Sequence, residues 1–464
     1  MPLVDMPQKH PGQFSQRARW AGGQPISELM HQALAHPQLI SLAAGFVDQQ
    51  SLPVEATRQA LEALLSEPLE ARSALQYGTT PGFAPLRERL LADLLSADRQ
   101  TPAEARLSAD QVVLTAGSNE LLHLVTDTLC DPGDVVLCTA PTYFVYSGIL
   151  KNLGVRSFGV ASDGEGLVPE ALDECLSRLD AAGLLARVKA LYIVSYFDNP
   201  RGISLTEERR GPIVDLVRRY SRQAGHPIYI IDDMAYRELR YEGDDPPSLR
   251  RYDEAGDTVI ATHTFSKSFS PGLRVGYGVM PRQVLAAVCE QKGNINFGSP
   301  NFNQHLIAKV LEAGLWEPHV ERLRAAYRPK LAAMLSAAEE YFAPIEGVRW
   351  VRPHGGLYVW VELPEGIDAG PNRRQKLFER AIAEGVLYVP GEFCFPAEGV
   401  EPRPGTMRLS FGVQSCERIR HGVAALARAI RLTREEGAQA GAAGASNGAA
   451  GSASLKQSRK IGDG

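Results

Sequence analysis

The chain has 464 residues, of which 44% are hydrophobic and 22% are charged, and its formal net charge is −5. This length exceeds one ordinary domain, so two packed domains are expected. The charges form no basic block, which argues against nucleic acid as a partner. No apolar run is long enough to cross a membrane, and the polar first 15 residues do not resemble a signal peptide.

The six cysteines form no CxxC pair and are widely spaced along the chain. This spacing argues against a zinc site or a disulfide framework, so we expect free thiols, no metal and a cytoplasmic location.

Residues 1–40 are interpreted as an N-terminal arm. Helices are predicted at Pro53–Leu64 and Pro85–Leu95. Six short apolar runs with helix-like stretches between them then predict βαβ units and a mainly parallel, covered sheet. These runs are Val112–Thr115, Val135–Thr139, Ala190–Ser195, Ile228–Ile231, Val259–Thr262 and Arg274–Val279.

A long helical pattern follows at Asn303–Phe342, and then a smaller α+β domain is predicted. Its strands are expected at Val348–Val351 and Leu357–Glu362, and its helices at Asn372–Glu384 and Cys416–Leu432. Between residues 437 and 454 every residue except two is Gly, Ala or Ser, which predicts disorder. The expected organisation is an arm (1–40), a large α/β domain (41–300), a small C-terminal domain (301–434) and a disordered tail (435–464).

Lys267 lies just beyond a predicted buried strand, among hydroxyl side chains and seven residues before Arg274. A lysine that forms a Schiff base must be deprotonated, and both desolvation and nearby positive charge lower its pKa. Thr264, Ser266 and Arg274 are suited to binding a phosphate. Taken alone, such a lysine is far more often an exposed residue after a strand.

Two further strand ends carry polar groups. After Thr115 a glycine turn leads into a helix whose first turn holds Ser118 and Asn119; helix N-termini bind phosphates, although Ser118 could simply cap the helix. The run at residues 228–231 ends in Asp232 and Asp233, followed by Tyr236. An acid here could pair with a protonated ring nitrogen, which makes pyridoxal 5′-phosphate (PLP) an electron sink, or it could cap the next turn.

Asn199 and Tyr143 follow two other predicted strands, on turns that contain proline. An amide and a phenol are suited to binding a ring oxygen and to stacking on a ring. Open α/β sheets bind ligands at the carboxyl ends of their strands. Five polar side chains that follow five such ends therefore indicate one shared site: Ser118, Tyr143, Asn199, Asp233 and Lys267.

The segment from Thr264 to Gly276 resembles the S-x-S-K-x-x-x-P-G-x-R-x-G pattern of the class I/II aminotransferases, with Thr264 in place of the first serine. These are PLP enzymes of fold type I, and the resemblance runs from about Ser41 to Ala429. It implies a seven-stranded, mainly parallel sheet between helices. It also implies a homodimer with shared active sites, because Tyr77 resembles the tyrosine that reaches the neighbouring subunit's phosphate.

The resemblance assigns the following roles. Lys267 would bind the cofactor covalently, Asp233 would hold the pyridine nitrogen and Tyr143 would stack on the ring. Arg408 would grip the substrate α-carboxylate, with Gly45 near it. Of the remaining residues, Tyr236 and Asn199 would bind the ring oxygen, and Ser118, Asn119, Thr264, Ser266 and Arg274 would hold the phosphate.

Several positions depart from the family pattern, among them Val47, Gln49, Asn119 and Arg201. The stretch from Lys292 to Gln304 has no arginine, so no second carboxylate clamp is predicted there. The pattern is nearest the α-aminoadipate/kynurenine/aromatic branch, whose N-terminal arm often covers the substrate. Arg17, Arg19 and Trp20 lie in the arm here, which could equally be solvated.

The predicted function is a PLP-dependent aminotransferase that moves an amino group from an amino acid to a 2-oxo acid, with 2-oxoglutarate as the expected acceptor, by a ping-pong mechanism through Lys267. A PLP lyase or decarboxylase on the same fold is an alternative, since the cofactor supports all of these reactions. A regulator that uses the fold as a sensor is a third. No helix-turn-helix pattern is found in the roughly 40 residues before Ser41.

Overall fold

The computed structural model describes residues 14–21, 38–371 and 376–454. Its largest sheet has the strand order β2-β9-β8-β7-β6-β3-β4-β5. Strands β3, β4, β6, β7 and β8 are parallel to their neighbours in this group, whereas β9 is antiparallel to both β2 and β8. The strands are β2 (Val112–Thr115), β3 (Val135–Ala140), β4 (Arg156–Asp163), β5 (Gly166–Leu167), β6 (Val188–Val194), β7 (Tyr229–Asp233), β8 (Val259–Thr264) and β9 (Gly276–Val279).

The predicted mainly parallel sheet is therefore confirmed. Seven strands have four residues or more, and the two-residue β5 folds back on β4 as an eighth. Strand β4 was not predicted from the sequence, because its burial pattern mixes buried, half-buried and exposed residues and its sequence contains Gly159 and two serines.

Helices cover both faces of this sheet, as the alternation of side chains along a strand requires. In β3, Val136 and Cys138 pack in the same core as α7 (Ser118–Leu129) and α8 (Phe144–Leu153). Val135 and Leu137 pack in a second core with α9 (Pro169–Ala181) and α10 (Glu207–Ala224). The helix α12 (Arg282–Asn296) lies against α7.

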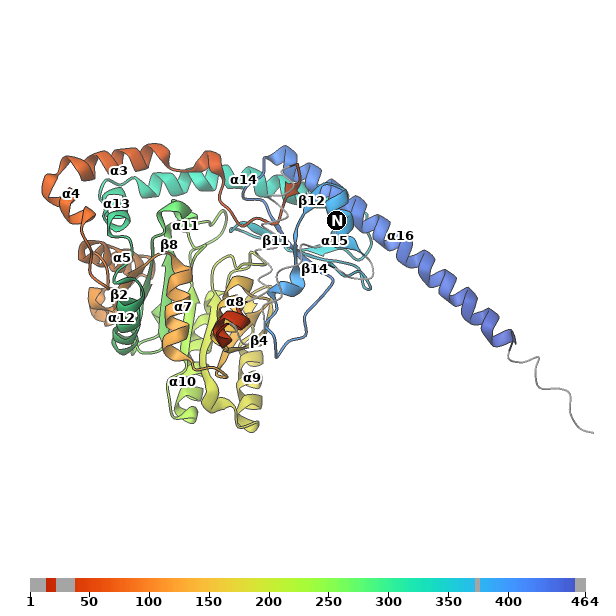
Figure 1. The fold of residues 1–464 in the computed structure, drawn as a ribbon, viewed down its shortest axis with the longest axis horizontal. Coiled ribbons are helices and arrows are strands. Elements are labelled where there is room, and N and C mark those ends of the chain that lie inside the picture. Colours follow the sequence, from red (N-terminus) through yellow and green to blue (C-terminus); the bar gives the residue numbers. More distant parts are fainter. Residues whose placement is uncertain (1–13, 22–37, 372–375, 455–464) are drawn as a thin grey trace, which may run out of the picture.

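The pattern from Asn303 to Phe342 forms two helices rather than one: α13 (Asn301–Glu312) and α14 (Trp316–Tyr341). They are separated at Gly314, whose φ of +62° is accessible to glycine and ends the first helix. Among the helices that precede the large sheet are α3 (Val54–Ser66), α4 (Pro68–Leu75) and α5 (Ala84–Ala97). Figure 1 shows α14 running from the side of α13 to the start of α16.

The smaller C-terminal domain contains a four-stranded antiparallel sheet with the order β10-β11-β14-β13. Its strands are β10 (Arg349–Trp350), β11 (Tyr358–Glu362), β13 (Val389–Pro390) and β14 (Thr406–Ser410), and its helices include α15 (Leu377–Ala383) and α16 (Cys416–Ser454). The short strand β1 (Ile40–Ser41) pairs with β12 (Val386–Leu387) of this domain. The chain thus contacts the small domain before it enters the large one.

The tail differs from its prediction. Helix α16 continues to Ser454, so residues 435–454 are helical where disorder was expected, and residues 455–464 lie outside the described residues. Alanine has the highest helix propensity, and extending a helix that has already formed needs no new nucleus. The Gly/Ala/Ser composition was therefore weaker evidence for disorder than the sequence analysis assumed. Figure 1 shows the end of α16 projecting away from the rest of the molecule.

Among the described helices, none combines the length and the apolarity that a bilayer crossing requires.

Candidate active site

A cavity of about 160 Å³ lies at the carboxyl ends of the parallel strands. It brings together side chains from five separate segments of the chain, as expected for this edge of the sheet. The lining includes every residue predicted to hold the cofactor except Tyr77: Ser118, Asn119, Tyr143, Asn199, Asp233, Tyr236, Thr264, Ser266, Lys267 and Arg274.

Lys267 lies on the short helix α11 (Phe265–Ser268), directly after β8. Its Nζ donates a hydrogen bond to the carbonyl oxygen of Gly45 at 2.8 Å. Burial lowers the pKa of the lysine, and the positive charges of Arg408 and Arg274 lower it further. The environment therefore favours the neutral amine, which is the nucleophilic form.

Hydroxyl groups, a guanidinium and a helix N-terminus meet at one end of the cavity. Arg274 donates to Ser266 Oγ at 3.2 Å, and Thr264 Oγ1 donates to the same atom at 2.9 Å. Helix α7 begins at Ser118 after Gly117, whose φ is +84°. A Cβ atom on Gly276 would lie 2.7 Å from the backbone nitrogen of Ser118, so only glycine permits this close approach. Hydroxyls, a guanidinium and a helix N-terminus in this arrangement have the chemistry suited to a phosphate.

Asp233 ends strand β7 and is buried. Its Oδ2 accepts a hydrogen bond from the hydroxyl of Tyr192 at 2.8 Å, and its Oδ1 accepts one from the backbone N–H of Ala235 at 3.2 Å. Burial raises the pKa of Asp233 to about 6 in spite of these bonds. The neighbouring Asp232 faces the other side of the sheet, because successive strand residues alternate, and there it accepts bonds from Ser195 Oγ and the Leu249 N–H.

Arg408 comes from β14 of the small domain and is buried beside the cavity. It donates to Asn199 Oδ1 at 2.8 Å and to the carbonyl oxygen of Ala43 at 2.6 Å. Its Nε has no hydrogen-bond partner among the described residues. Arg408 and Gly45 do not line the 160 Å³ cavity itself, but they contact two residues that do, Asn199 and Lys267.

Two tyrosines of the site were missed by the sequence analysis. The hydroxyl of Tyr358 lies 3.1 Å from that of Tyr236, and the Arg408 guanidinium lies 4.3 Å from the Tyr358 ring centre. A Cβ atom on Gly45 would lie 2.6 Å from the Tyr358 hydroxyl, so glycine makes room for it. Tyr358 and Tyr192 both lie inside predicted apolar strands. Only the hydroxyl group on each otherwise apolar side chain could have indicated that the residue belongs to the site.

Tyr77 lies outside the cavity of its own chain. It is 82% exposed and makes an edge-to-face contact with Phe297 at 5.7 Å.

The described part of the arm also lies away from the cavity. Helix α1 (Gln16–Trp20) packs on α8; Arg17 pairs with Asp127 near the end of α7, and the Trp20 ring approaches Gly154 at the end of α8. The cavity is at the opposite end of α7. The structure thus does not bring Arg17, Arg19 and Trp20 to the site, because their helix is anchored at the far ends of α7 and α8.

Comparison with known proteins agrees with the resemblance found in the sequence. The family "Aminotransferase class I and II" matches residues 37–426. The aromatic-amino-acid aminotransferase 1 of Thermococcus litoralis is 33% identical over 418 residues, which cover 90% of this chain and 94% of that protein.

Two solved structures are similar over nearly their whole length. A kynurenine aminotransferase from Pyrococcus horikoshii in complex with PMP has a TM-score of 0.80 at 33% identity and covers 90% of this chain and 97% of its own. An α-aminoadipate aminotransferase from Thermus thermophilus, complexed with N-(5′-phosphopyridoxyl)-L-leucine, has a TM-score of 0.76 at 31% identity and covers 91% and 98%. The chain therefore belongs to the class I and II aminotransferases and is a PLP-dependent amino-acid aminotransferase.

Proposed function

We propose that the enzyme transfers the amino group of an amino acid to a 2-oxo acid, with 2-oxoglutarate as acceptor, in a ping-pong mechanism that depends on Lys267. The observation that carries this proposal is the position of the Lys267 amine, which lines one cavity together with a phosphate-type site and a buried carboxylate. The lowered pKa of the lysine supports the same role.

The residues of the cavity fit PLP. Its phosphate would be held by the hydroxyls of Ser266 and Thr264, by Arg274 and by the start of α7, where the glycines at 117 and 276 leave the backbone accessible. Tyr143 would cover the ring, and Asp233 would hold its nitrogen at the opposite end. When bound, PLP supplies an electron sink for the substrate's α-carbon.

The protein's own groups would then move the protons. Lys267 Nζ, whose pKa is lowered by burial, would take the proton from the α-carbon of the substrate as a general base and, as a general acid, deliver it to the cofactor carbon that carries the transferred nitrogen. Asp233 would carry a negative charge opposite the pyridine nitrogen, and the hydroxyl of Tyr192 would orient its carboxylate through the 2.8 Å bond.

Substrate recognition would centre on Arg408. A planar guanidinium binds a carboxylate through two parallel hydrogen bonds, and Asn199 already orients this one. Amino acids and 2-oxo acids both carry the carboxylate beside the reacting carbon, so both would use the same clamp. One clamp cannot hold two substrates at once, which supports a ping-pong order.

Three relatives support a preference for large side chains, since they are described as acting on aromatic amino acids, kynurenine or α-aminoadipate.

We include in the proposal a homodimer in which Tyr77 contacts the phosphate in the neighbouring subunit's site. Exposed apolar side chains near Tyr77, those of Leu75 and Phe297, support an interface, because such patches commonly mark one. The six free cysteines support a reducing, cytoplasmic location.

The test is a screen of the amino acids against 2-oxoglutarate and pyruvate, measuring the amino product formed from each. We expect aromatic or long-chain donors to be converted fastest, with glutamate as the main product, and Lys267→Ala to form none. Release of carbon dioxide or elimination products in place of an amino product would overturn the proposal.

A further inference from the structure

Tyr358 of strand β11 reaches the active site from the small domain. The residue is 1% exposed, and its hydroxyl lies 3.1 Å from that of Tyr236, which lines the cavity beside Lys267. The two rings meet edge to face, with their centres 5.8 Å apart. Among the described residues, the Tyr358 hydroxyl has no other hydrogen-bond partner. Any effect of this hydroxyl on the cavity therefore passes through Tyr236.

The direction of this hydrogen bond follows from the expected role of Tyr236, which is to bind the ring oxygen of the cofactor; the inference thus rests on the proposed function. In PLP the ring oxygen is on the carbon next to the one that carries the aldehyde, which is the group that a lysine binds. Lys267 Nζ lies 6.0 Å from the centre of the Tyr236 ring. A phenol has one proton. When Tyr236 donates that proton to the ring oxygen, its own oxygen can only accept, so Tyr358 is the donor.

A hydrogen bond received by the Tyr236 oxygen strengthens the one that Tyr236 donates, because linked hydrogen bonds polarise one another, most of all in a buried site. We propose that Tyr358 is a positioning residue. Its hydroxyl holds and polarises the hydroxyl of Tyr236, so that Tyr236 stabilises the negative charge on the ring oxygen of the cofactor more strongly.

The ring of Tyr358 has a separate contact, which a phenylalanine would keep. The Arg408 guanidinium lies over this ring at 4.3 Å from its centre, and it lies 5.4 Å from the centre of the Phe144 ring. Both rings attract the cation electrostatically. Tyr358→Phe therefore keeps the support of Arg408 and removes only the hydroxyl, whereas Tyr358→Leu removes both.

The negative charge on the ring oxygen sets the direction of the expected effect. In the holoenzyme, the nitrogen that joins Lys267 to the cofactor carries a proton beside this oxygen. When that proton leaves, the oxygen loses its positive neighbour and depends on the remaining donors, so a stronger donor lowers the pH at which the proton leaves. Loss of the Tyr358 hydroxyl should raise that pH. The other ionisable groups around the two tyrosines are unchanged by the substitution: Tyr143, Asp233, Lys267, Arg274, Tyr327 and Arg408.

The test is a pH titration of the visible absorption band of the holoenzyme, without substrate, in the wild type and in Tyr358→Phe. We expect the midpoint to rise by about 0.5 pH unit in the variant, which is part of the effect of one neutral hydrogen bond. Tyr388→Phe is the matched control. Tyr388 is also buried in the small domain, and its hydroxyl donates to the carbonyl oxygen of Ala369, so its loss should leave the midpoint unchanged.

Steady-state kinetics separates the hydroxyl from the ring. Tyr358→Phe should leave KM for amino acids and 2-oxo acids within about twofold of the wild type. Tyr358→Leu should raise KM at least about threefold, because Arg408 loses the ring that supports it. A raised KM in Tyr358→Phe with an unmoved midpoint would mean that Tyr358 acts on Arg408 alone, and the proposal would be wrong.

A double-mutant cycle checks that the effect passes through Tyr236. In a Tyr236→Phe background, Tyr358→Phe should no longer move the midpoint, because the group on which it acts is gone. Equal shifts in both backgrounds, or no larger shift than in Tyr388→Phe, would overturn the proposal.

A second substitution keeps the test valid even if Tyr358→Phe fails to fold. Replacing Tyr358 by 3-fluorotyrosine keeps the hydroxyl and makes it more acidic, hence a stronger donor, so the midpoint should fall; an unchanged or raised midpoint would contradict the proposal. A wild-type holoenzyme without a visible band that borohydride removes would instead contradict the proposed role of Lys267, and this inference with it.

Discussion

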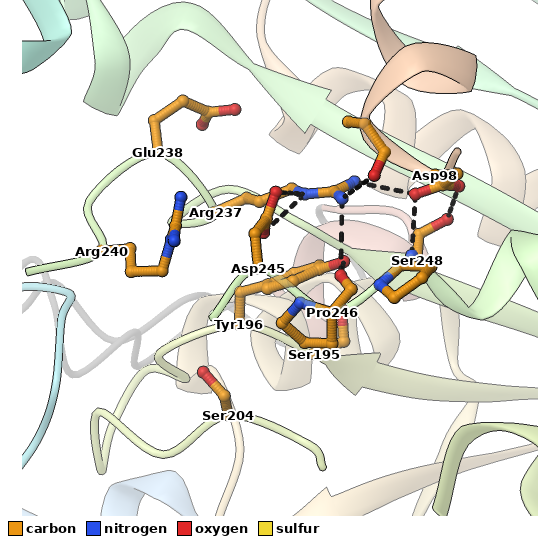
Figure 2. A network of polar contacts seen from close by, with 12 residues as sticks. Asp98, Ser195, Tyr196, Ser204, Arg237, Glu238, Arg240, Asp245, Pro246 and Ser248 are labelled. Carbon is orange, nitrogen blue, oxygen red and sulfur yellow. Dashed lines mark hydrogen bonds and ion pairs between the residues drawn. The ribbon is translucent and has the colours of Figure 1, made fainter. Parts of the chain in front are cut away.

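Charged groups at the edge of the large sheet and in the buried network around Arg237 differ in how completely other protein groups bond to them. At the edge, Lys267 has a lowered pKa, Asp233 has a raised one, and Arg408 keeps a buried N–H without a partner among the described residues. In the network of Figure 2, Arg237 and Asp98 bond to each other and to several further protein groups. Charges that serve the fold are saturated by protein partners, whereas charges that serve chemistry are left with capacity for a ligand.

The largest effect expected from this comparison is at Lys267. Lys267→Ala removes the amine that we propose as nucleophile and proton carrier, so activity should fall by at least about 10⁴-fold. Treatment with borohydride followed by mass spectrometry should fix the cofactor to the wild-type chain but not to the variant. The control is Lys292→Met, since Lys292 is also buried and has a pKa lowered by burial but lies outside the cavity. Full activity in Lys267→Ala would contradict the central assignment.

Arg408→Ala should have the next largest effect. It leaves a substrate carboxylate without its charged partner in a buried site, a loss of about 2–5 kcal/mol. Steady-state kinetics should therefore show amino acids and 2-oxo acids weakened alike, with the cofactor still bound. Arg428→Ala, at an exposed ion pair with Glu384, is the control. If only one class of substrate is affected, Arg408 contacts the substrate side chain and not the α-carboxylate.

Asp233 and Asp232 offer the sharpest comparison, because they are adjacent in one strand. Asp233→Asn should lower the rate by about 10²-fold, roughly 2.7 kcal/mol of barrier, and Asp232→Asn should lower it much less.

Their effects on stability, in contrast, should have the same sign. The folded-state pKa of Asp233 is raised from 3.8 to about 6, so ionising it costs stability as pH rises through this interval, and the full cost is present above pH 6. Asp233→Asn should therefore stabilise the apoenzyme by about 1–3 kcal/mol at pH 8 but hardly at pH 4. Burial also raises the pKa of Asp232 above its ordinary value, so Asp232→Asn should likewise stabilise the apoenzyme more at pH 8 than at pH 4. Thermal unfolding of both variants at the two pH values checks the signs, and a loss of stability at pH 8 in Asp233→Asn would contradict this prediction.

The smallest effect is expected at Tyr77. Its side chain is largely exposed, so it belongs neither to the cavity at the sheet edge nor to the buried network. Equal mixing of Tyr77→Ala and Lys267→Ala subunits should give hybrid dimers with one intact site, and activity should recover to roughly a quarter of wild type. Subunit exchange can be followed with two different affinity tags. Proven exchange without any recovery, or a monomer on sizing, would rule out a shared site.

Much of the site could be predicted because its residues follow strands with strong apolar patterns. Lys267 and Asp233 both lie just where such a run ends, and parallel strands bring those ends together. Strand β4 was not predicted because its pattern of buried and exposed residues is irregular. The place of Tyr358 in the site was not predicted because it depends on how β11 of the small domain meets Gly45. Such contacts between distant segments leave no trace in local periodicity. The extension of α16 escaped because its composition suits a helix and a disordered chain equally well.

Helix α14 connects the two parts of the molecule. Its 26 residues span about 39 Å at 1.5 Å per residue, with Trp316 at one end and the contact with α16 at the other. A tilt of only about 5° at the Trp316 end would displace the far end of a straight helix by about 3 Å, simply through its length. A slight repacking around Trp316 would thus be magnified, as by a lever arm, at the small domain that carries Arg408.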